Sequence, residues 1–456
     1  MFNEALKSGN LPEEVYEGNI IDLYKGKGVK IDPNNYRGIA LLDTTLKIYT
    51  AILCSRLNEA VESHKLLPDT QYGFRKGRST IKAAKVLKGY INHDILEAGH
   101  SYACFVDFKQ AFDSVSRNKL AHKLYRMKIR GPFLRSIIAI LRGTRVAVRQ
   151  DRTNSEFFTT TKGIPQGDRL SPILFALFIA DLSEILLKQG VKVIFYADDL
   201  VITSSKIENI QDALDRLAMY CEDNELRVNV AKTHAMKFRK GGRIHPRDKL
   251  YYNKQPISYQ NSFIYLGIVF STKQSLDSHL HHLKSKSAKA LNRLHAKVNL
   301  RKVRYKSAGR LLDSIIKQTA TYGTEVFNLL DDEKSNNKFV EHCKKICGMF
   351  WKRWCGISLY WRNSRLLKMM HIDDPLRIQR CRKVDRRKIA IYYANGYHHK
   401  MCSENNCYDI KDDCQCKFCK FPIFGPDHIF LCSNIQESKY LDKVRFLYGH
   451  DSSDAQ

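Results

Sequence analysis

Two runs of apolar, β-type residues enclose a pair of adjacent aspartates in the segment VKVIFYADDLVITS, residues 191–204. The pattern predicts a β-hairpin with Asp198 and Asp199 at its tip. Aspartate is common in turns and is inert in most of them. This segment alone therefore leaves both a structural and a catalytic role open.

A second acidic segment strengthens the catalytic interpretation. In ACFVDFKQAFDSV, residues 103–115, a β-type run ends at Asp107 and a predicted helix with Phe112 follows. An aspartate at a strand end can meet a hairpin tip across a neighbouring strand. Two divalent ions that clamp the oxygens of a phosphoryl transfer need carboxylates on rigid strands. Asp107, Asp198 and Asp199 would supply these carboxylates.

The order of predicted elements indicates an α+β fold. From Ser101 to Phe270, short β-type runs alternate with longer helical segments, one of which begins near Ile207. A glycine-containing loop leads into an apolar helix in GIPQGDRLSPILFALFIADL, residues 163–182, and would let the backbone approach a base or sugar closely. After about residue 275 the β-type runs end, and Lys, Arg and His interrupt apolar positions at helical spacing.

Composition and charge narrow the class of partner. A chain of 456 residues with 43% hydrophobic residues excludes a disulfide-stapled peptide and a mostly disordered protein. The longest apolar run, 173–180, is too short to span a bilayer, and no secretory signal opens the sequence, so we expect an intracellular protein without a membrane partner. Of the net charge of +29, residues 281–400 contribute +19. Such a one-signed excess favours a nucleic acid partner.

Seven segments, taken in order, resemble the motifs of reverse transcriptases of non-LTR (LINE-type) retrotransposons. They are NYRGIALL (35–42), QYGFRKGRST (71–80), FVDFKQAFDSV (105–115), GIPQGDRLSP (163–172), YADD (196–199), LRVNVAKT (226–233) and FIYLG (263–267). The resemblance implies an RNA-directed DNA polymerase that adds deoxynucleotides (dNTPs) to the 3′-OH of a DNA primer or target on an RNA template.

The same resemblance implies a right-hand polymerase architecture. The expected domains are fingers at 1–95, a palm at 96–275, a basic helical thumb or connector at 276–400, a zinc knuckle at 401–440 and a tail at 441–456.

Site residues follow from the resemblance, position by position. Asp107, Asp198 and Asp199 would hold two Mg²⁺ or Mn²⁺ ions, and Phe112 would exclude a ribose 2′-OH. The remaining assignments are nucleotide contacts by Arg37, Gln166 and Lys232, and primer or template contacts by Arg75, Arg78, Leu266 and Gly267. Core packing for Phe112, and ordinary surface positions for Arg37 and Lys232, are the competing interpretations.

A cysteine-rich segment near the C-terminus has metal-ligand spacing. Cys416-x2-Cys419-x8-His428-x3-Cys432 carries the residues of a closed, structural Zn²⁺ site. It also resembles the CCHC knuckle of many non-LTR reverse transcriptases. Cys414 would replace Cys416 by a shift of register, and no role follows for Cys402 or Cys407.

Other functions remain open at this stage. An RNA-dependent RNA polymerase shares the palm, but its hairpin normally reads Gly-Asp-Asp, and Phe112 argues against ribonucleotides. A group II intron-type maturase and a domesticated element that only binds nucleic acid are the further alternatives. We also expect that an endonuclease must act in trans or on a missing N-terminal segment. The basic runs KVDRRK and RKVRYK would permit nuclear entry but would equally serve RNA phosphates.

Overall fold

The computed structural model describes residues 1–9, 11–26, 28–150, 153–188, 190–239, 241, 245, 248–327 and 333–356. The chain divides into two compact units, one spanning Met1–Ser275 and one beginning at Leu276. The first unit contains the residues predicted as fingers and palm, and the second begins with those predicted as the thumb. Among the described residues, no helix is both long and apolar enough to cross a bilayer.

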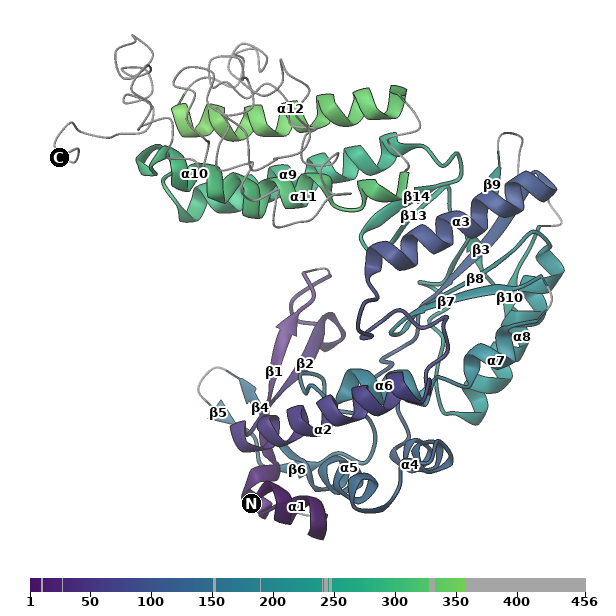
Figure 1. Ribbon diagram of the computed structural model, residues 1–456, viewed down its shortest axis with the longest axis vertical. Coiled ribbons are helices and arrows are strands. Elements are labelled where there is room, and N and C mark those ends of the chain that lie inside the picture. The colour runs from purple at the N-terminus through teal and green to yellow at the C-terminus, as the bar shows by residue number, and fades with distance from the viewer. Residues whose placement is uncertain are drawn as a thin grey trace, which may run out of the picture. The chain divides into compact units, whose positions relative to one another are not determined.

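A five-stranded sheet forms the centre of the first unit, in the order β12-β9-β3-β8-β7. Figure 1 shows β9, β3, β8 and β7 of this sheet. Its strands are β3 (His100–Val106), β7 (Lys192–Tyr196), β8 (Asp199–Ser204), β9 (His234–Arg239) and β12 (Ser258–Tyr259). β3 runs antiparallel to both of its neighbours, and six of its seven residues are buried. A strand buried on both faces reads as a continuous apolar run. This explains why YACFV shows no alternation of polar and apolar residues.

Two helices cover this sheet. α3 (Thr80–Ala98) and α8 (Ile207–Asp223) both pack against β3 and β8. Ser79 caps the start of α3, where its hydroxyl accepts a hydrogen bond from the Lys82 amide. The buried positions of α8 recur at helical spacing and are Ile210, Ala213, Leu214, Leu217, Tyr220 and Cys221. The predicted helix near Ile207 is confirmed.

A second sheet carries the N-terminal part of the unit, in the order β2-β1-β4-β5, with β6 also paired to β4. Its strands are β1 (Glu17–Tyr24), β2 (Tyr36–Leu42), β4 (Arg145–Gln150), β5 (Thr153–Asn154) and β6 (Phe158–Thr159). The helices of this region are α1 (Phe2–Ser8), α2 (Thr44–Ser63), α4 (Arg117–Arg126) and α5 (Gly131–Gly143). Two short hairpins complete the strands of the unit: β10 (Tyr251–Tyr252) with β11 (Gln255–Pro256), and β13 (Ser262–Tyr265) with β14 (Ile268–Ser271).

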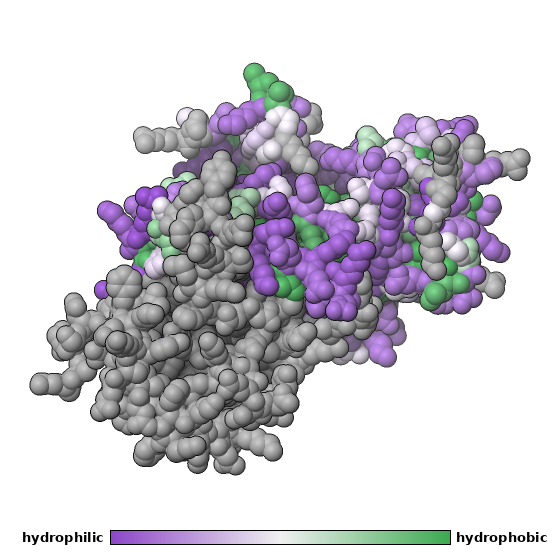
Figure 2. Space-filling model, turned by 90° about the horizontal axis from the view of Figure 1, so that it is seen from above, coloured by the Kyte–Doolittle hydropathy of each residue, from purple (hydrophilic) through white to green (hydrophobic). Residues whose placement is uncertain are grey.

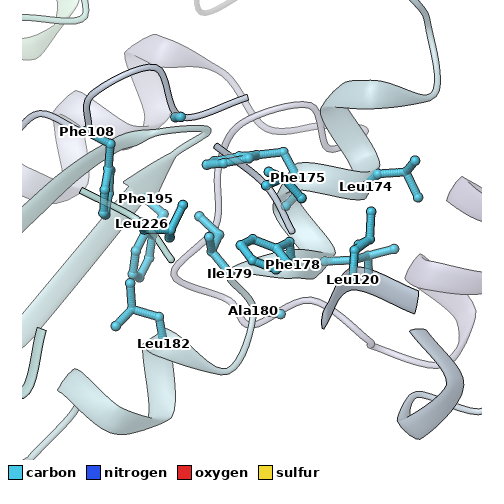
Figure 3. Close-up of a cluster of buried hydrophobic side chains, with 14 of the residues drawn as sticks. Phe108, Leu120, Leu174, Phe175, Phe178, Ile179, Ala180, Leu182, Phe195 and Leu226 are labelled. Carbon is cyan, nitrogen blue, oxygen red and sulfur yellow. The ribbon is translucent and has the colours of Figure 1, made fainter. Parts of the chain in front are cut away.

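One buried helix joins the two sheet regions through a common core. α6 (Ser171–Phe178) is buried at every position except Pro172, and α7 (Leu182–Leu186) follows it. Figure 3 shows Phe175 and Phe178 of this segment among Phe108, Phe195 and Leu226. A helix that is apolar all round belongs in the interior of a large unit. The acidic segments of the sheet therefore rest on a single continuous core.

The described part of the second unit contains helices and connecting turns but no strand. It consists of α9 (Leu276–Lys297), α10 (Tyr305–Leu311), a π-helical turn (Leu312–Lys317), α11 (Gln318–Thr321) and α12 (Glu333–Cys355). Two apolar clusters, one around Phe350 and one around Phe339, hold these helices together. The indole nitrogen of Trp354 donates to the carbonyl of Val303 at 2.8 Å.

Candidate active site

The predicted hairpin with two aspartates is present. β7 and β8 pair through Tyr196 and Asp199, so the turn consists of Ala197 and Asp198. Ala197 has a φ of 57°, in the left-handed region that a two-residue hairpin turn requires. This geometry places Asp198 in the turn and Asp199 at the first position of β8.

Asp107 follows directly after the last residue of β3, and Val106 pairs with Leu200 next to the turn. Its backbone is held on both sides by the segment 229–233. The Asp107 amide donates to the Thr233 hydroxyl at 3.3 Å, and the Asn229 amide donates to the Asp107 carbonyl at 2.7 Å. The strand pairing therefore brings the three aspartates to one end of the sheet.

The acids affect one another electrostatically. Although Asp199 is exposed at the surface, the protein atoms around it desolvate the carboxylate and, with the charges of Asp198 and Asp107, raise its pKa to about 6. Desolvation also raises the pKa of Asp198, assisted by Asp107, while the Arg37 guanidinium opposes the shift. Like charges gathered in a poorly solvated place favour protonation or a counter-ion.

The donor set fits a hard divalent cation, since Mg²⁺ and Mn²⁺ prefer carboxylate oxygens. In the part of the chain that the structure describes, however, no three acidic, histidine or cysteine side chains are close enough to form a ready-made metal site. The aspartates thus lie within electrostatic range of one another, but their carboxylates are not grouped tightly enough to ligate one ion together. The raised pKa values of Asp198 and Asp199, to both of which the charge of Asp107 contributes, are the observation that favours a cation here.

Phe112 lies among turns at 109–114, so the helix predicted for this residue is wrong, because α4 begins only at Arg117. Gln166 lies on a loop that is hydrogen-bonded to this segment. The Ile164 amide donates to the Phe112 carbonyl at 3.0 Å, and the half-buried Phe112 ring stacks on Phe175 at 4.8 Å between centroids. The Gln166 amide nitrogen donates to both carboxylate oxygens of Asp113, each at 3.1 Å. Burial raises the pKa of Asp113, while this hydrogen bond and Lys25 lower it.

Arg37 belongs to β2, which is tied to the loop of Gln166. The Ala40 amide donates to the Gln166 carbonyl at 2.7 Å. Gly167, with a φ of 115°, packs so closely that a Cβ would lie 2.8 Å from the Ala40 carbonyl oxygen. The exposed Arg37 is near enough to Asp198 to affect its pKa. Arg37 and Gln166 are therefore carried by one connected structure beside the acidic turn.

Lys232 is exposed and lies in the turn 229–233, the segment that also bonds to the backbone of Asp107. Leu266 and Gly267 form the turn of the β13–β14 hairpin, with φ values of 49° and 79°. This hairpin packs on β3, where Phe263 stacks on Phe105 at 4.4 Å.

Two of the residues predicted to contact primer or template, Arg75 and Arg78, are hydrogen-bonded to other residues of the protein. Arg75 donates two hydrogen bonds to the Glu62 carboxylate, at 2.9 and 2.8 Å, and its side chain is 7% exposed. Arg78 contacts the carbonyl and the carboxylate of Asp69, both at 2.6 Å, and is 23% exposed. Their roles toward nucleic acid stay predictions, and the geometry of Arg75 favours a structural contribution.

Sequence reasoning assigned no role to Gln71 or Asp113, although both stand inside the quoted motifs. Gln71 accepts hydrogen bonds beside the acidic turn, and Asp113 holds the amide of Gln166. For Asp113, the available signal was its place directly after Phe112. The zinc candidates Cys416, Cys419, His428 and Cys432 lie outside the described residues.

The surface carries mostly polar groups where it is visible. Figure 2 shows a largely hydrophilic face with small, scattered hydrophobic spots among the described residues. On α9, the exposed side chains include Lys284, Lys286, Lys289 and Arg293. A polar, basic surface of this kind suits a polyanionic partner.

Comparison with known proteins identifies the family to which the chain belongs. A family model described as "Reverse transcriptase (RNA-dependent DNA polymerase)" matches residues 25–270. The jockey mobile element RNA-directed DNA polymerase of Drosophila melanogaster is 24% identical over 393 residues, covering 82% of this chain and 42% of that protein. The probable RNA-directed DNA polymerase of the X-element, from the same organism, is 23% identical over 403 residues, covering 85% and 43%.

A third relative, the probable RNA-directed DNA polymerase of transposon BS of Drosophila melanogaster, is 28% identical over 244 residues. That match covers 51% of this chain and 27% of that protein. The chain thus spans less than half the length of each of these relatives. The family match extends over the two acidic segments and the loop between them, and the predicted relationship to non-LTR elements is confirmed. The chain belongs to the reverse transcriptase (RNA-dependent DNA polymerase) family, among relatives from non-LTR, LINE-type retrotransposons.

Proposed function

We propose that this chain is an RNA-directed DNA polymerase that transfers deoxynucleotides to a primer 3′-OH on an RNA template. The observation that carries the proposal is the convergence of Asp107, Asp198 and Asp199 at one end of the central sheet, with the pKa values of Asp198 and Asp199 raised. Carboxylates gathered in a poorly solvated place are costly to the fold. A phosphoryl transfer that uses metal ions bound by these carboxylates is the most direct reason to keep them.

Asp107, Asp198 and Asp199 would hold two Mg²⁺ or Mn²⁺ ions. When bound, these ions would activate the primer hydroxyl and neutralise charge on the phosphates. Asp199, with a pKa of about 6, is ionised at neutral pH and available as a ligand. The hydrogen bonds of Asn229 and Thr233 fix the backbone of Asp107, so this carboxylate leaves a rigid support.

The protein groups around the acids would bind and select the nucleotide. Arg37, which already affects the pKa of Asp198, would pair with the triphosphate. Phe112, packed on one side against Phe175, would block a ribose 2′-OH. Gln166, with its nitrogen held by Asp113, would present its carbonyl oxygen toward the nucleotide or the templating base. Lys232 would assist the leaving pyrophosphate.

The remaining contacts belong to the nucleic acid and to the rest of the element. We propose that the helical unit, the fingers residue Arg78, and the β13–β14 turn at Leu266 and Gly267 contact the template and primer. A target-cleaving endonuclease would act in trans or on a segment outside this sequence. Nuclear entry through the basic runs is part of the same proposal.

A Zn²⁺ knuckle at Cys416, Cys419, His428 and Cys432 is proposed from ligand spacing. Four protein ligands would close the site, so the ion would order the segment and take no part in polymerisation. Elemental analysis of the purified protein should give one zinc per chain, and Cys419→Ser should lose it. A protein without stoichiometric zinc, in which Cys416 and Cys419 are freely alkylated, would contradict this part of the proposal.

Primer extension on an RNA template, with purified protein, dNTPs and Mg²⁺ or Mn²⁺, tests the function. The wild type should extend the primer, and Asp198→Ala should abolish extension while leaving RNA binding within about twofold, because the basic contacts stay intact. The matched control is Asp212→Ala, which removes an exposed carboxylate of α8 away from the turn. RNA binding without extension by the wild type would replace the polymerase proposal with that of a nucleic-acid-binding protein.

A further inference from the structure

The acidic turn is supported from outside the hairpin, by residues 70–73. β7 is the edge strand of the central sheet, and this segment pairs with it in parallel through Gln71 and Phe195. The Phe195 amide donates to the Thr70 carbonyl at 2.9 Å, and the Tyr72 amide donates to the Phe195 carbonyl at 2.7 Å. The segment therefore reaches the turn along a hydrogen-bonded path.

Gln71 makes the contact with the turn itself. Its side chain is buried, at 2% exposure, and its Oε1 accepts hydrogen bonds from the Gly73 amide at 2.8 Å and the Ala197 amide at 3.1 Å. Ala197 is the residue in left-handed conformation immediately before Asp198. One buried carbonyl oxygen thus fixes both the end of the supporting segment and the start of the acidic turn.

The segment 70–73 packs closely against the acidic turn. A Cβ on Gly73 would collide with the backbone nitrogen of Ala197. The turn needs such support for two reasons. A non-glycine residue in left-handed conformation is strained, and the charges of Asp107, Asp198 and Asp199 repel one another across the turn. Neither the strain nor the repulsion is relieved by the two-residue turn alone.

We propose that Gln71 is a positioning residue for the catalytic turn, holding the Ala197 amide so that Asp198 and Asp199 stay aligned with Asp107. The inference rests on the proposed polymerase function for its kinetic consequence. Its structural consequence, the protection of the Ala197 amide, can be measured without activity. Gln71 touches neither nucleotide nor metal in this role and acts only through the turn.

The first test replaces the carbonyl oxygen. Gln71→Met keeps the length of the side chain but has no oxygen acceptor, whereas Gln71→Glu keeps an oxygen that can accept both amides. Gln71→Met should lower kcat for primer extension by about tenfold to a hundredfold, with the KM for dNTP changed by less than about threefold, because alignment fails while binding persists. Gln71→Glu should recover part of the lost kcat.

Hydrogen exchange, followed by mass spectrometry on the peptide covering 195–200 in the absence of metal, gives the second readout. Exchange should be about fivefold faster in Gln71→Met, as expected for a lost hydrogen bond, and slower again in Gln71→Glu. Tyr49→Phe is the control, since it removes a buried hydrogen bond to Ser136 elsewhere in the unit. It should leave both kcat and this peptide unchanged.

A second pair of variants tests the same contact without altering Gln71. Gly73→Ala should displace the turn and reduce kcat at least as strongly as Gln71→Met. Gly89→Ala is the matched control, because a Cβ at that helical glycine meets nothing within 4 Å. It should be fully active.

The outcomes separate this inference from the proposed function. A Gln71→Met protein with wild-type kcat and wild-type exchange would overturn the positioning role and leave the polymerase intact. Absence of extension by the wild type would overturn the proposed polymerase function. Faster exchange in Gln71→Met would still support the role of Gln71 in holding the Ala197 amide. If Gln71→Met and Gly73→Ala both fail to fold while Gly89→Ala folds, Gln71 is a general structural residue and the inference is wrong.

Discussion

The aspartates of the central sheet and the arginines of residues 75–78 were predicted as members of one site, and their surroundings are opposite. Desolvation and the charges of neighbouring carboxylates raise the pKa values of Asp198 and Asp199, and only Asp198 has a nearby arginine that opposes the shift. Arg75 and Arg78, by contrast, are each bonded to a carboxylate and a backbone carbonyl. Charged groups whose neighbours disfavour their ionised form are candidates for catalysis. Charged groups that are already hydrogen-bonded to opposite charges are candidates for a structural role.

The substitution with the largest expected effect on extension is Asp107→Asn. The substitution keeps the shape of the side chain and removes the charge, so extension should fall by about a thousandfold or more, while RNA affinity stays within about twofold. Primer extension and a filter-binding assay measure the two quantities. Extension within about tenfold of the wild type would place Asp107 outside the chemistry.

Phe112 shares features of the catalytic and the structural candidates. Its ring packs on Phe175, as in a structural residue, but the side chain is only half-buried. Phe112→Val should lower the discrimination against ribonucleotides by about ten- to a hundredfold, since the smaller side chain leaves space for a 2′-OH. Competition between dNTP and rNTP measures the ratio. Phe112→Tyr keeps the ring and serves as control, and an unchanged ratio in a folded Phe112→Val protein would make Phe112 a core residue.

The raised pKa of Asp199 predicts a pH dependence of cation binding. Below pH 6, a proton competes with the cation for this carboxylate, so the half-saturating Mg²⁺ concentration should rise by up to about tenfold per pH unit. Above pH 7 it should be constant. Extension rates measured against Mg²⁺ from pH 5 to 8 test this, and a half-saturating concentration that does not change with pH would contradict it.

For the arginines, the comparison predicts an effect on stability. Arg75→Ala should lower the free energy of unfolding by about 1–2 kcal/mol, because it removes the hydrogen bonds of a nearly buried guanidinium to the Glu62 carboxylate and the Pro68 carbonyl. RNA affinity should change less than in Lys76→Ala, which removes an exposed charge from the same loop. Denaturant unfolding and salt-dependent RNA binding measure both. A larger loss of RNA affinity in Arg75→Ala, with unchanged stability, would reverse the assignment.

The smallest expected effect concerns stability at the acidic turn. The folded state holds the proton of Asp199 more tightly than the unfolded chain, so the ionised carboxylate destabilises the fold fully above about pH 6 and less as pH falls toward the ordinary aspartate value. Asp199→Asn should therefore raise Tm by about 1–2 °C at pH 8 without added cation, and by less at pH 5. A lower Tm at pH 8 would mean that the carboxylate has a stabilising partner.

Local patterns in the sequence were sufficient for much of the fold. The apolar runs around residues 100–106, 192–204 and 262–271 are strands, and the segment after Ile207 is a helix. These predictions hold because apolar periodicity and turn residues act over a few neighbouring positions. The support of Ala197 by Gln71, 126 positions away along the chain, lies beyond any such local signal.

By itself, the sequence determined that a hairpin presents two aspartates and that a further strand ends in a third, because strand and turn formation depend on adjacent residues. Only the tertiary structure decided which charged groups stay unsatisfied. Glu62 of helix α2 reaches Arg75 and completes its hydrogen bonds, while strand pairing brings Asp107 toward two other acids. Charge interactions act across a few ångströms of space, irrespective of separation along the chain, so the packing of distant elements determines which residues remain available for chemistry.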